Sequence, residues 1–328
     1  MNATSSIESN AQQLLVGRLA PSPTGAQHVG NARTYLIAWL SIRSRGGRVI
    51  MRIEDLDSPR VKAWAVEQAM GDLRWLGLDW DEGPDIGGPN GPYVQTQRLE
   101  LYRDAFESLR VSERIYPCTC SRSDVLAAAS APHAGHEGPI YPGTCATRSA
   151  TDAESLNDQP FSWRFRTTPT NRRLNDLCVG ESDLNLATEL GDFVIAKSDG
   201  TPAYQLAVVC DDHAMQVTEV LRGDDLLPSA FRQIELYDFF GWSVPQFAHV
   251  PLVVGPDGRR LAKRHGDTRL STLRDEGVRP ETLLGLLAQS CGLRQIAKPT
   301  SARELLADFD LAKLPRAPFI YQDAQLNR

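Results

Sequence analysis

The most constraining feature of this sequence is a strand, a tight turn, a helix and a second strand that follow one another within residues 14–53. The apolar run at 14–20 predicts a strand, which Pro21 ends. Residues 32–44 have the composition of a helix, and residues 48–53 predict the second strand. Such a βαβ unit requires parallel strands, so we predict an α/β fold that binds its ligand at the carboxyl ends of the strands.

Composition excludes several classes of protein. The 328 residues carry a formal net charge of −6, with 41% hydrophobic and 23% charged residues, which is ordinary for a globular enzyme. No apolar run approaches the roughly 18 residues of a membrane span, and the polar start lacks the pattern of a signal peptide. We therefore expect a cytoplasmic protein with no membrane or DNA partner. Net acidity argues against a protein that coats nucleic acid, although a local basic face can still bind RNA.

A distinct segment begins near residue 117 and separates the elements before it from those that follow. We expect a disordered tail at 1–13, the first half of a domain at 14–116, an inserted subdomain at 117–197, the second half of that domain at 198–264 and a C-terminal helical segment at 265–328. Within these segments we expect helices at 60–76 and 96–114, a loop at 83–92, strands within 161–197, alternating strand-like apolar positions at 204–223 and a capping box at 301–304.

The turn APSPTGAQHVGN at residues 20–31 is the first candidate site. Its Gly, Pro and small residues let the backbone turn tightly and approach a ligand. The helix start that follows offers N–H groups and a positive dipole end to phosphate, and His28 can donate to a phosphate oxygen. The turn matches neither a Walker loop nor a dinucleotide-binding GxGxxG, and by itself it is equally compatible with a plain structural turn.

A basic segment, RLAKRHGD at residues 260–267, is the second candidate site. It follows a Gly-Pro-Asp-Gly turn at 255–258, which is typical of a loop whose cations can close over a triphosphate. By itself, such a segment is more typical of a solvated surface.

Three cysteines, Cys118, Cys120 and Cys145, form the third candidate site. Three thiolates and one further donor suit tetrahedral Zn²⁺, whereas three buried thiols are the alternative. His133 and His136 lie between these cysteines and are chemically better donors than a phenol. The remaining cysteines are scattered, and the chain is not a disulfide scaffold.

Taken together, these motifs resemble the class I aminoacyl-tRNA synthetases of the glutamyl type. Residues 18–31 resemble the HIGH region of that family, with the motif itself at 21–31, and residues 260–264 resemble its KMSKS region. The resemblance continues through 52–57, 95–98 and 221–227 and covers roughly residues 14–270. Asn31 stands in place of the second His of HIGH, and Arg260 and Ala262 replace the first Lys and the Ser of KMSKS, whereas Lys263 is kept. The resemblance implies a Rossmann-like catalytic domain.

It also implies that ATP and L-glutamate react to form glutamyl-adenylate, with Mg²⁺ accompanying ATP. The implied ATP-binding residues are His28, Gly30, Asn31 and Lys263, of which His28 and Lys263 are the implied catalytic residues. The implied glutamate-binding residues are Arg18, Leu19, Ala20, Pro21, Ser22, Glu54, Tyr204 and Arg222. Guanidinium groups suit the two carboxylates of glutamate, and Glu54 suits its ammonium. Without the resemblance, Arg18 would be read as a surface residue, Glu54 as a helix cap and Tyr204 as a strand aromatic.

Only 328 − 264 = 64 residues follow the KMSKS-like segment, fewer than the anticodon-binding domain of glutamyl-tRNA synthetases needs. We therefore expect no such domain, which indicates the shorter paralogues of the family that attach glutamate to queuosine at the anticodon wobble position of tRNA(Asp). Their pattern Cys-x-Cys…Tyr-x3-Cys implies one structural Zn²⁺ held by Cys118, Cys120, Tyr141 and Cys145. The alternatives are a truncated glutamyl-tRNA synthetase that charges a tRNA 3′ end, and an inactive paralogue that binds RNA. We expect a monomer.

Overall fold

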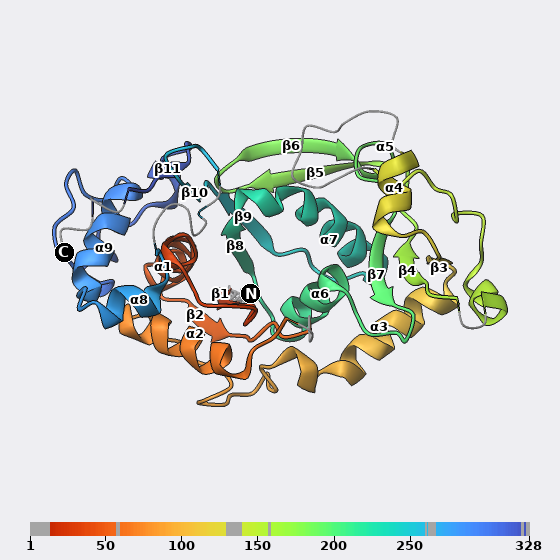
Figure 1. The fold of residues 1–328 in the computed structure, drawn as a ribbon, viewed down its shortest axis with the longest axis horizontal. Helices are drawn as coiled ribbons and strands as arrows, with labels where there is room; N and C mark the ends of the chain where they lie inside the picture. The colour runs from red at the N-terminus through yellow and green to blue at the C-terminus, as the bar shows by residue number, and fades with distance from the viewer. Residues whose placement is uncertain are drawn as a thin grey trace, which may run out of the picture.

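A computed structural model describes residues 14–56, 60–128, 140–156, 159–259, 261, 267–322 and 325. The expected tail at 1–13 lies outside the described residues. In Figure 1, the central strands lie between C-terminal elements at one end of the molecule and the segment with α4, β3 and β4 at the other. Among the described residues, no helix is both long and apolar enough to cross a membrane.

The elements alternate between strands and helices along much of the chain. The strands are β1 (Val16–Leu19), β2 (Arg48–Met51), β3 (Ile115–Cys118), β4 (Ser162–Phe165), β5 (Asn171–Asp176), β6 (Gly180–Asn185), β7 (Phe193–Lys197), β8 (Glu219–Gly223), β9 (Gln246–Val250), β10 (Val253–Val254) and β11 (Phe319–Ile320). The α-helices are α1 (Val29–Arg43), α2 (Ala63–Trp75), α3 (Leu99–Val111), α4 (Arg122–Ala128), α5 (Leu186–Glu189), α6 (Tyr204–Ala214), α7 (Leu227–Phe240), α8 (Leu270–Asp275) and α9 (Pro280–Ser290).

The predicted βαβ unit is confirmed. Strands β1 and β2 pair in parallel with α1 between them in sequence, and β8 and β9 form a second parallel pair. The two pairs adjoin where the Thr218 N–H donates to the Val16 carbonyl at 2.9 Å, and the Arg18 side chain donates to the Leu221 carbonyl at 3.1 Å. The four strands therefore end at one edge, where parallel α/β sheets bind ligands.

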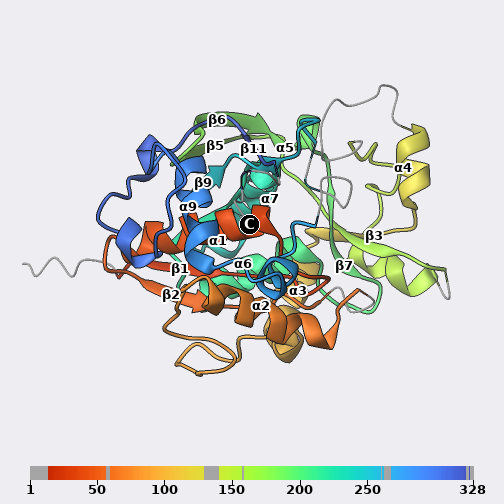
Figure 2. The ribbon, with the colours of Figure 1, turned by 60° about the vertical axis from the view of Figure 1, so that its left-hand side comes forward.

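Both faces of this sheet are covered, as its alternating side chains show. Val49 and Met51 of β2 pack with residues of α1, α2 and α9, whereas Ile50 between them packs with residues of α3, α6 and α7. Figure 2 shows α1 and α9 on the side of the C-terminus. Gly17 allows α1 to lie close to β1, because a Cβ there would come within 2.4 Å of Ile42 Cγ1.

The inserted segment is rich in strands, as predicted for 161–197. Strands β3, β4 and β7 form an antiparallel sheet, and β5 and β6 form a hairpin. The turn of that hairpin reaches the central sheet, since the Leu177 N–H donates to the Phe247 carbonyl of β9 at 2.9 Å. The β5–β6 hairpin therefore contacts the central sheet at β9.

The expectation of strand-like structure throughout 204–223 is wrong. Residues 204–214 form α6, and only 219–223 form a strand, β8. The run 206–210 is apolar and buried at every position, so neither a helical nor a strand period is visible in it. Tyr204 is consequently the first residue of a helix and not a strand aromatic.

The C-terminal segment is only partly helical. Helices α8 and α9 agree with the expectation, and the capping box forms, with Glu304 Oε2 accepting from the Ser301 N–H at 2.8 Å. The capping box is followed only by a 3-10 turn at Arg303–Leu305 and not by an α-helix. Further along the chain, β11 pairs in parallel with β10. Packing against the central domain therefore decides the form of these residues.

Helix α2 carries a buried carboxylate that generates a prediction about stability. Asp72 is fully buried with neither side-chain oxygen hydrogen-bonded, and Arg274 of α8 lies 3.3 Å away. Burial raises the Asp72 pKa to about 6, against the opposing effect of Arg274. The folded state thus binds a proton that the unfolded state releases between about pH 4 and 6, so the carboxylate lowers stability as the pH rises through that window.

We expect Asp72→Asn to raise the free energy of unfolding at pH 7.5 by about 2 kcal/mol and to have little effect near pH 4. Urea denaturation at both pH values measures the difference. Asp308→Asn, at an exposed partner of Arg294, is the matched control and should show no such pH dependence. Equal effects of Asp72→Asn at both pH values would contradict the assignment.

Candidate active site

A cavity of about 550 Å³ opens at the carboxyl ends of the central strands. Of the residues predicted from the sequence, it is lined by Arg18, Ala20, Ser22, His28, Gly30, Asn31, Glu54, Tyr204 and Arg222. Leu19 and Pro21 are not among the lining residues: the Leu19 side chain belongs to the hydrophobic core, and the Pro21 carbonyl accepts from the Glu54 N–H at 3.1 Å. These two residues therefore support the site through the backbone.

His28 caps the amino end of α1 with its own side chain. Its Nδ1 accepts from the N–H groups of Gly30 and Asn31 at 3.1 and 3.3 Å, while Asn31 Oδ1 accepts from the His28 N–H at 3.3 Å. The expectation that these two N–H groups are open to phosphate is therefore wrong. Because Nδ1 accepts, the neutral ring carries its proton on Nε2, which can donate to an anion.

The departure of Asn31 from the HIGH pattern has a structural consequence. Its amide closes a reciprocal cap with His28, which holds the imidazole at the rim of the cavity. Asn is a favourable helix-capping partner because its short side chain reaches a backbone N–H.

A network of buried charges lies beneath the cavity. Arg52 is fully buried and donates to Asp212 at 2.6 Å and to Glu54 at 2.9 Å, and Arg18 lies 3.5 Å from the same Asp212. Burial raises the pKa of Glu54, although Arg52 and Arg18 oppose the shift. The reading of Arg18 as a surface residue is excluded, because it is 7% exposed.

Arg222 differs from Arg18 in having no acidic partner among the residues that the structure describes. Its guanidinium donates to His249 Nε2 at 3.0 Å, to the Tyr204 hydroxyl at 3.3 Å and to the Leu226 carbonyl at 3.3 Å. All three acceptors are uncharged, so within the described part of the chain no carboxylate binds this group directly. Burial lowers the Arg222 pKa. A buried cation at a cavity wall favours an anionic ligand.

Several residues of the site were missed by the sequence analysis. Thr34, Tyr35 and Asp225 line the cavity, and Asp212 and His249 bind its arginines. Thr34 and Tyr35 lie one turn beyond Asn31 on α1, so the helical period could have found them. Asp212 and His249 are distant in sequence from any motif.

The KMSKS-like segment is described only at Leu261, which lines the cavity. Arg260, Ala262 and Lys263 lie outside the described residues.

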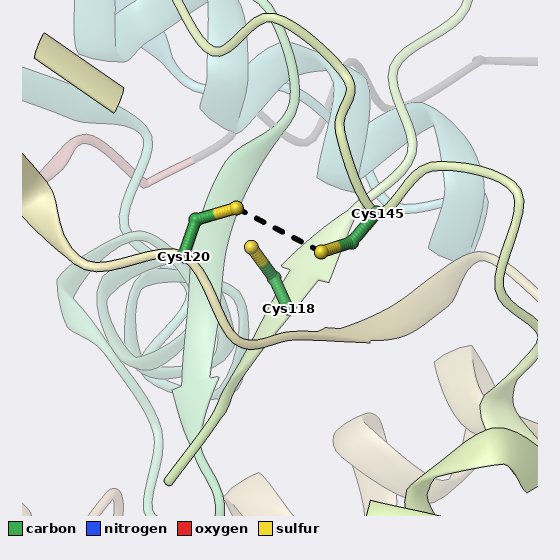
Figure 3. Close-up of side chains that lie close together, drawn as sticks. All are labelled: Cys118, Cys120 and Cys145. Atoms are coloured by element: carbon green, nitrogen blue, oxygen red, sulfur yellow. Dashed lines mark hydrogen bonds between the residues drawn. The ribbon is translucent and has the colours of Figure 1, made fainter. Parts of the chain in front are cut away.

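The three candidate metal ligands converge. Their sulfur atoms all lie within 4.8 Å of one another, and Figure 3 shows Cys118, at the end of β3, beside Cys120 and Cys145. The Cys120 and Cys145 sulfurs are 3.8 Å apart, which matches the edge of about 3.8 Å expected for a tetrahedron with Zn–S bonds of about 2.3 Å. This cluster can hold a metal ion.

Tyr141 completes the group. Its hydroxyl oxygen lies 3.3 Å from the Cys118 sulfur and 3.9 Å from that of Cys120, and it accepts from the Cys145 N–H at 2.8 Å. Burial alone would raise the pKa of Cys145, but hydrogen bonds from the Thr119 backbone and Tyr141 lower it to about 7. His133 and His136, the alternative donors, lie outside the described residues.

The fold is that of an α/β protein, and its cavity, at the carboxyl ends of the parallel strands, has the buried Arg18 and Arg222 in its wall. The sequence matches the family described as tRNA synthetases class I (E and Q), catalytic domain, over residues 15–327. The chain belongs to this family and is a ligase.

The chain is similar to several named members of this family. A protein of Symbiobacterium thermophilum named glutamyl-Q tRNA(Asp) synthetase is 52% identical over 93% of this chain and 95% of its own length. A protein of the same name from Rhodopirellula baltica is 48% identical over 94% of this chain and 97% of its own length. A solved glutamate tRNA ligase from Elizabethkingia meningosepticum, in complex with its amino acid, has a TM-score of 0.81 and 31% identity and covers 95% of this chain and 68% of that chain.

Proposed function

We propose that this enzyme activates L-glutamate with ATP, without tRNA, and transfers the glutamyl group to queuosine at the wobble position of tRNA(Asp). The observation that carries the proposal is Arg222, a buried cation with only uncharged partners, at the wall of a cavity that also holds Glu54 and His28. The names of the two relatives support the acceptor.

In this proposal, the residues of the cavity divide the charges of glutamate among them. Arg222, with the Tyr204 hydroxyl beside it, binds the side-chain carboxylate. Glu54 binds the ammonium, and Arg18 and Ser22 face the end of the substrate that reacts. Because Arg18 is already close to Asp212, it adds less net positive charge to the site than Arg222 does.

In the first step, an oxygen of the glutamate α-carboxylate attacks the α-phosphorus of ATP, and pyrophosphate leaves. His28 Nε2–H, at the helix start with Gly30 and Asn31, and Lys263 would stabilise the charge that spreads over the phosphates, and Mg²⁺ accompanying ATP would neutralise part of it. In the second step, a hydroxyl of the queuosine cyclopentene-diol attacks the acyl carbon, AMP leaves and the hydroxyl proton is released. Positioning supplies most of the catalysis in this step.

We also propose a structural zinc site made of Cys118, Cys120, Tyr141 and Cys145. The donor set supports this proposal, since three sulfurs within 4.8 Å of one another and a phenol oxygen 3.3 Å from the Cys118 sulfur supply four donors, the number that structural zinc sites use. Bound zinc would fix the loop that carries Cys145 against the end of β3. With four protein ligands it offers no open position for catalysis.

Arg222→Ala should lower kcat/KM for glutamate by roughly 30- to several-thousand-fold, equivalent to about 2–5 kcal/mol, because a shielded carboxylate loses its partner. Glutamate-dependent ATP–pyrophosphate exchange without tRNA measures it. Arg316→Ala, at an exposed arginine, is the control and should behave like wild type. Wild-type glutamate kinetics in Arg222→Ala would refute the assignment, and exchange that appears only after tRNA is added would refute tRNA independence.

The acceptor is tested with tRNA(Asp) from cells that can and cannot make queuosine. We expect labelled glutamate to enter only the queuosine-containing tRNA, as an ester labile to mild base. Nuclease digestion should locate the label on the anticodon nucleotide. Equal incorporation into both tRNAs, or label on the terminal adenosine, would favour a truncated glutamyl-tRNA synthetase instead.

Elemental analysis of freshly purified protein should find about one zinc per chain. Cys120→Ser should lose it, because a hydroxyl is a poorer zinc ligand than a thiolate. Cys178→Ser, at a half-buried cysteine outside the cluster, is the control and should keep it. Zinc that survives Tyr141→Phe but is lost in His136→Ala would reassign the fourth ligand.

A further inference from the structure

A chain of hydrogen bonds runs from the inserted hairpin to the cavity wall. Asp176 Oδ2 lies 2.6 Å from His249 Nδ1, and His249 Nε2 accepts from Arg222 Nε at 3.0 Å. Asp176 ends β5, His249 lies in β9 and Arg222 lies in β8. His249 is fully buried, and Asp176 and Arg222 are each 5% exposed. Only Arg222 lines the cavity.

The direction of these bonds fixes the tautomer of His249. A guanidinium can only donate, so His249 Nε2 must be the acceptor and its neutral ring must carry the proton on Nδ1. That proton then points at Asp176 Oδ2, which can only accept while it is ionised. The two hydrogen bonds therefore depend on each other. His249 can accept from Arg222 at Nε2 because its proton is on Nδ1, where the ionised Asp176 accepts it.

Asp176 is itself held in place by backbone donors. Its Oδ1 accepts from the N–H groups of Cys178 and Val179, both at 2.9 Å, and of His249 at 3.0 Å. The carboxylate is thus oriented by the hairpin turn and by β9 at the same time. It cannot rotate without breaking these bonds.

A neutral imidazole between the two charges has a further consequence. Direct contact between Asp176 and Arg222 would neutralise the guanidinium as Asp212 does for Arg18. Through His249, Arg222 receives a strong acceptor for Nε but no adjacent negative charge. Three of the five N–H groups of Arg222 are used by acceptors in the described residues, so two remain to bind a ligand.

We propose that Asp176 and His249 are positioning residues for Arg222, and that they thereby set the preference of the cavity for a carboxylate over a carboxamide. The proposal rests on the proposed function, since it takes the side-chain carboxylate of glutamate as the ligand of Arg222. His249 holds the guanidinium plane through Nε, and Asp176 holds His249 in the tautomer that accepts. The β5–β6 hairpin, which carries Asp176, therefore contributes to the amino acid specificity of the cavity.

The sharpest test is Asp176→Asn, which has the same shape. Asn Oδ1 can keep the three backbone bonds, and its amide N–H₂ then replaces Oδ2 opposite His249 Nδ1. The imidazole must accept there and carry its proton on Nε2, where it meets the Arg222 N–H donor to donor. We expect KM for glutamate to rise about 10- to 100-fold, the scale of one lost hydrogen bond to a charged group. KM for ATP should stay unchanged, and the ratio of kcat/KM for glutamate over glutamine should fall.

Two comparisons separate positioning from a loss of folded protein. The control, Asp192→Asn, makes the same chemical change at a half-buried aspartate that does not line the cavity. Asp192 accepts from Tyr116 and Thr167. This variant should leave KM and the glutamate–glutamine ratio at wild-type values. His249→Gln, whose oxygen can accept from Arg222 while its N–H₂ donates to Asp176, should keep a higher ratio than His249→Leu.

Pyrophosphate exchange with each amino acid in wild-type and variant enzymes, with thermal melting to report folding, gives these values. Wild-type KM and ratio in both Asp176→Asn and His249→Leu would overturn the positioning role while leaving the proposed glutamate activity intact. An equal loss of kcat in all variants, with KM and ratio unchanged, would also overturn it. No glutamate-dependent exchange in wild type would instead overturn the proposed function, and the positioning role with it.

Discussion

The fully buried guanidinium of Arg52 joins the end of β2 to α6, and the geometry of the cavity depends on it. It donates to Asp212 of α6 and to Glu54, two residues further along the chain, and it lies 3.7 Å from Asp211. Several acids share this one cation, so removing it would leave buried charges uncompensated, at a cost of about 3–5 kcal/mol. The contact between Arg52 and Asp212 also holds α6, whose first residue, Tyr204, lines the cavity.

The two arginines of the cavity are made different by their neighbours. Arg18 shares Asp212 with Arg52, whereas Arg222 is held by an imidazole, a phenol and a carbonyl. The site therefore has a nearly neutral side and a positive side. In the proposed function, a substrate with two carboxylates and one ammonium would have a single orientation that satisfies both sides and Glu54, so that a pocket with a few charges could select one amino acid.

The inserted segment contributes to the catalytic domain as well as to its own cysteine cluster. Its antiparallel sheet carries Cys118 at the end of β3, while its hairpin carries Asp176 to β9. None of the three cysteines is among the residues that line the cavity, whereas the hairpin contacts β9 at His249, the partner of Arg222.

The sequence by itself determined the βαβ unit and its parallel strands, because short strands and Gly/Pro turns are local signals. It also gave half of the residues that line the cavity, because its motifs resemble those of a known family. It could not determine that 204–214 is a helix, because the run at 206–210 is buried at every position and shows no period. Nor could it show that the His28 ring occupies the helix N–H groups, or that His249 and Asp176 stand behind Arg222. The contact between His249 and Asp176 joins residues 73 positions apart, and only the packing of the hairpin against β9 brings them together.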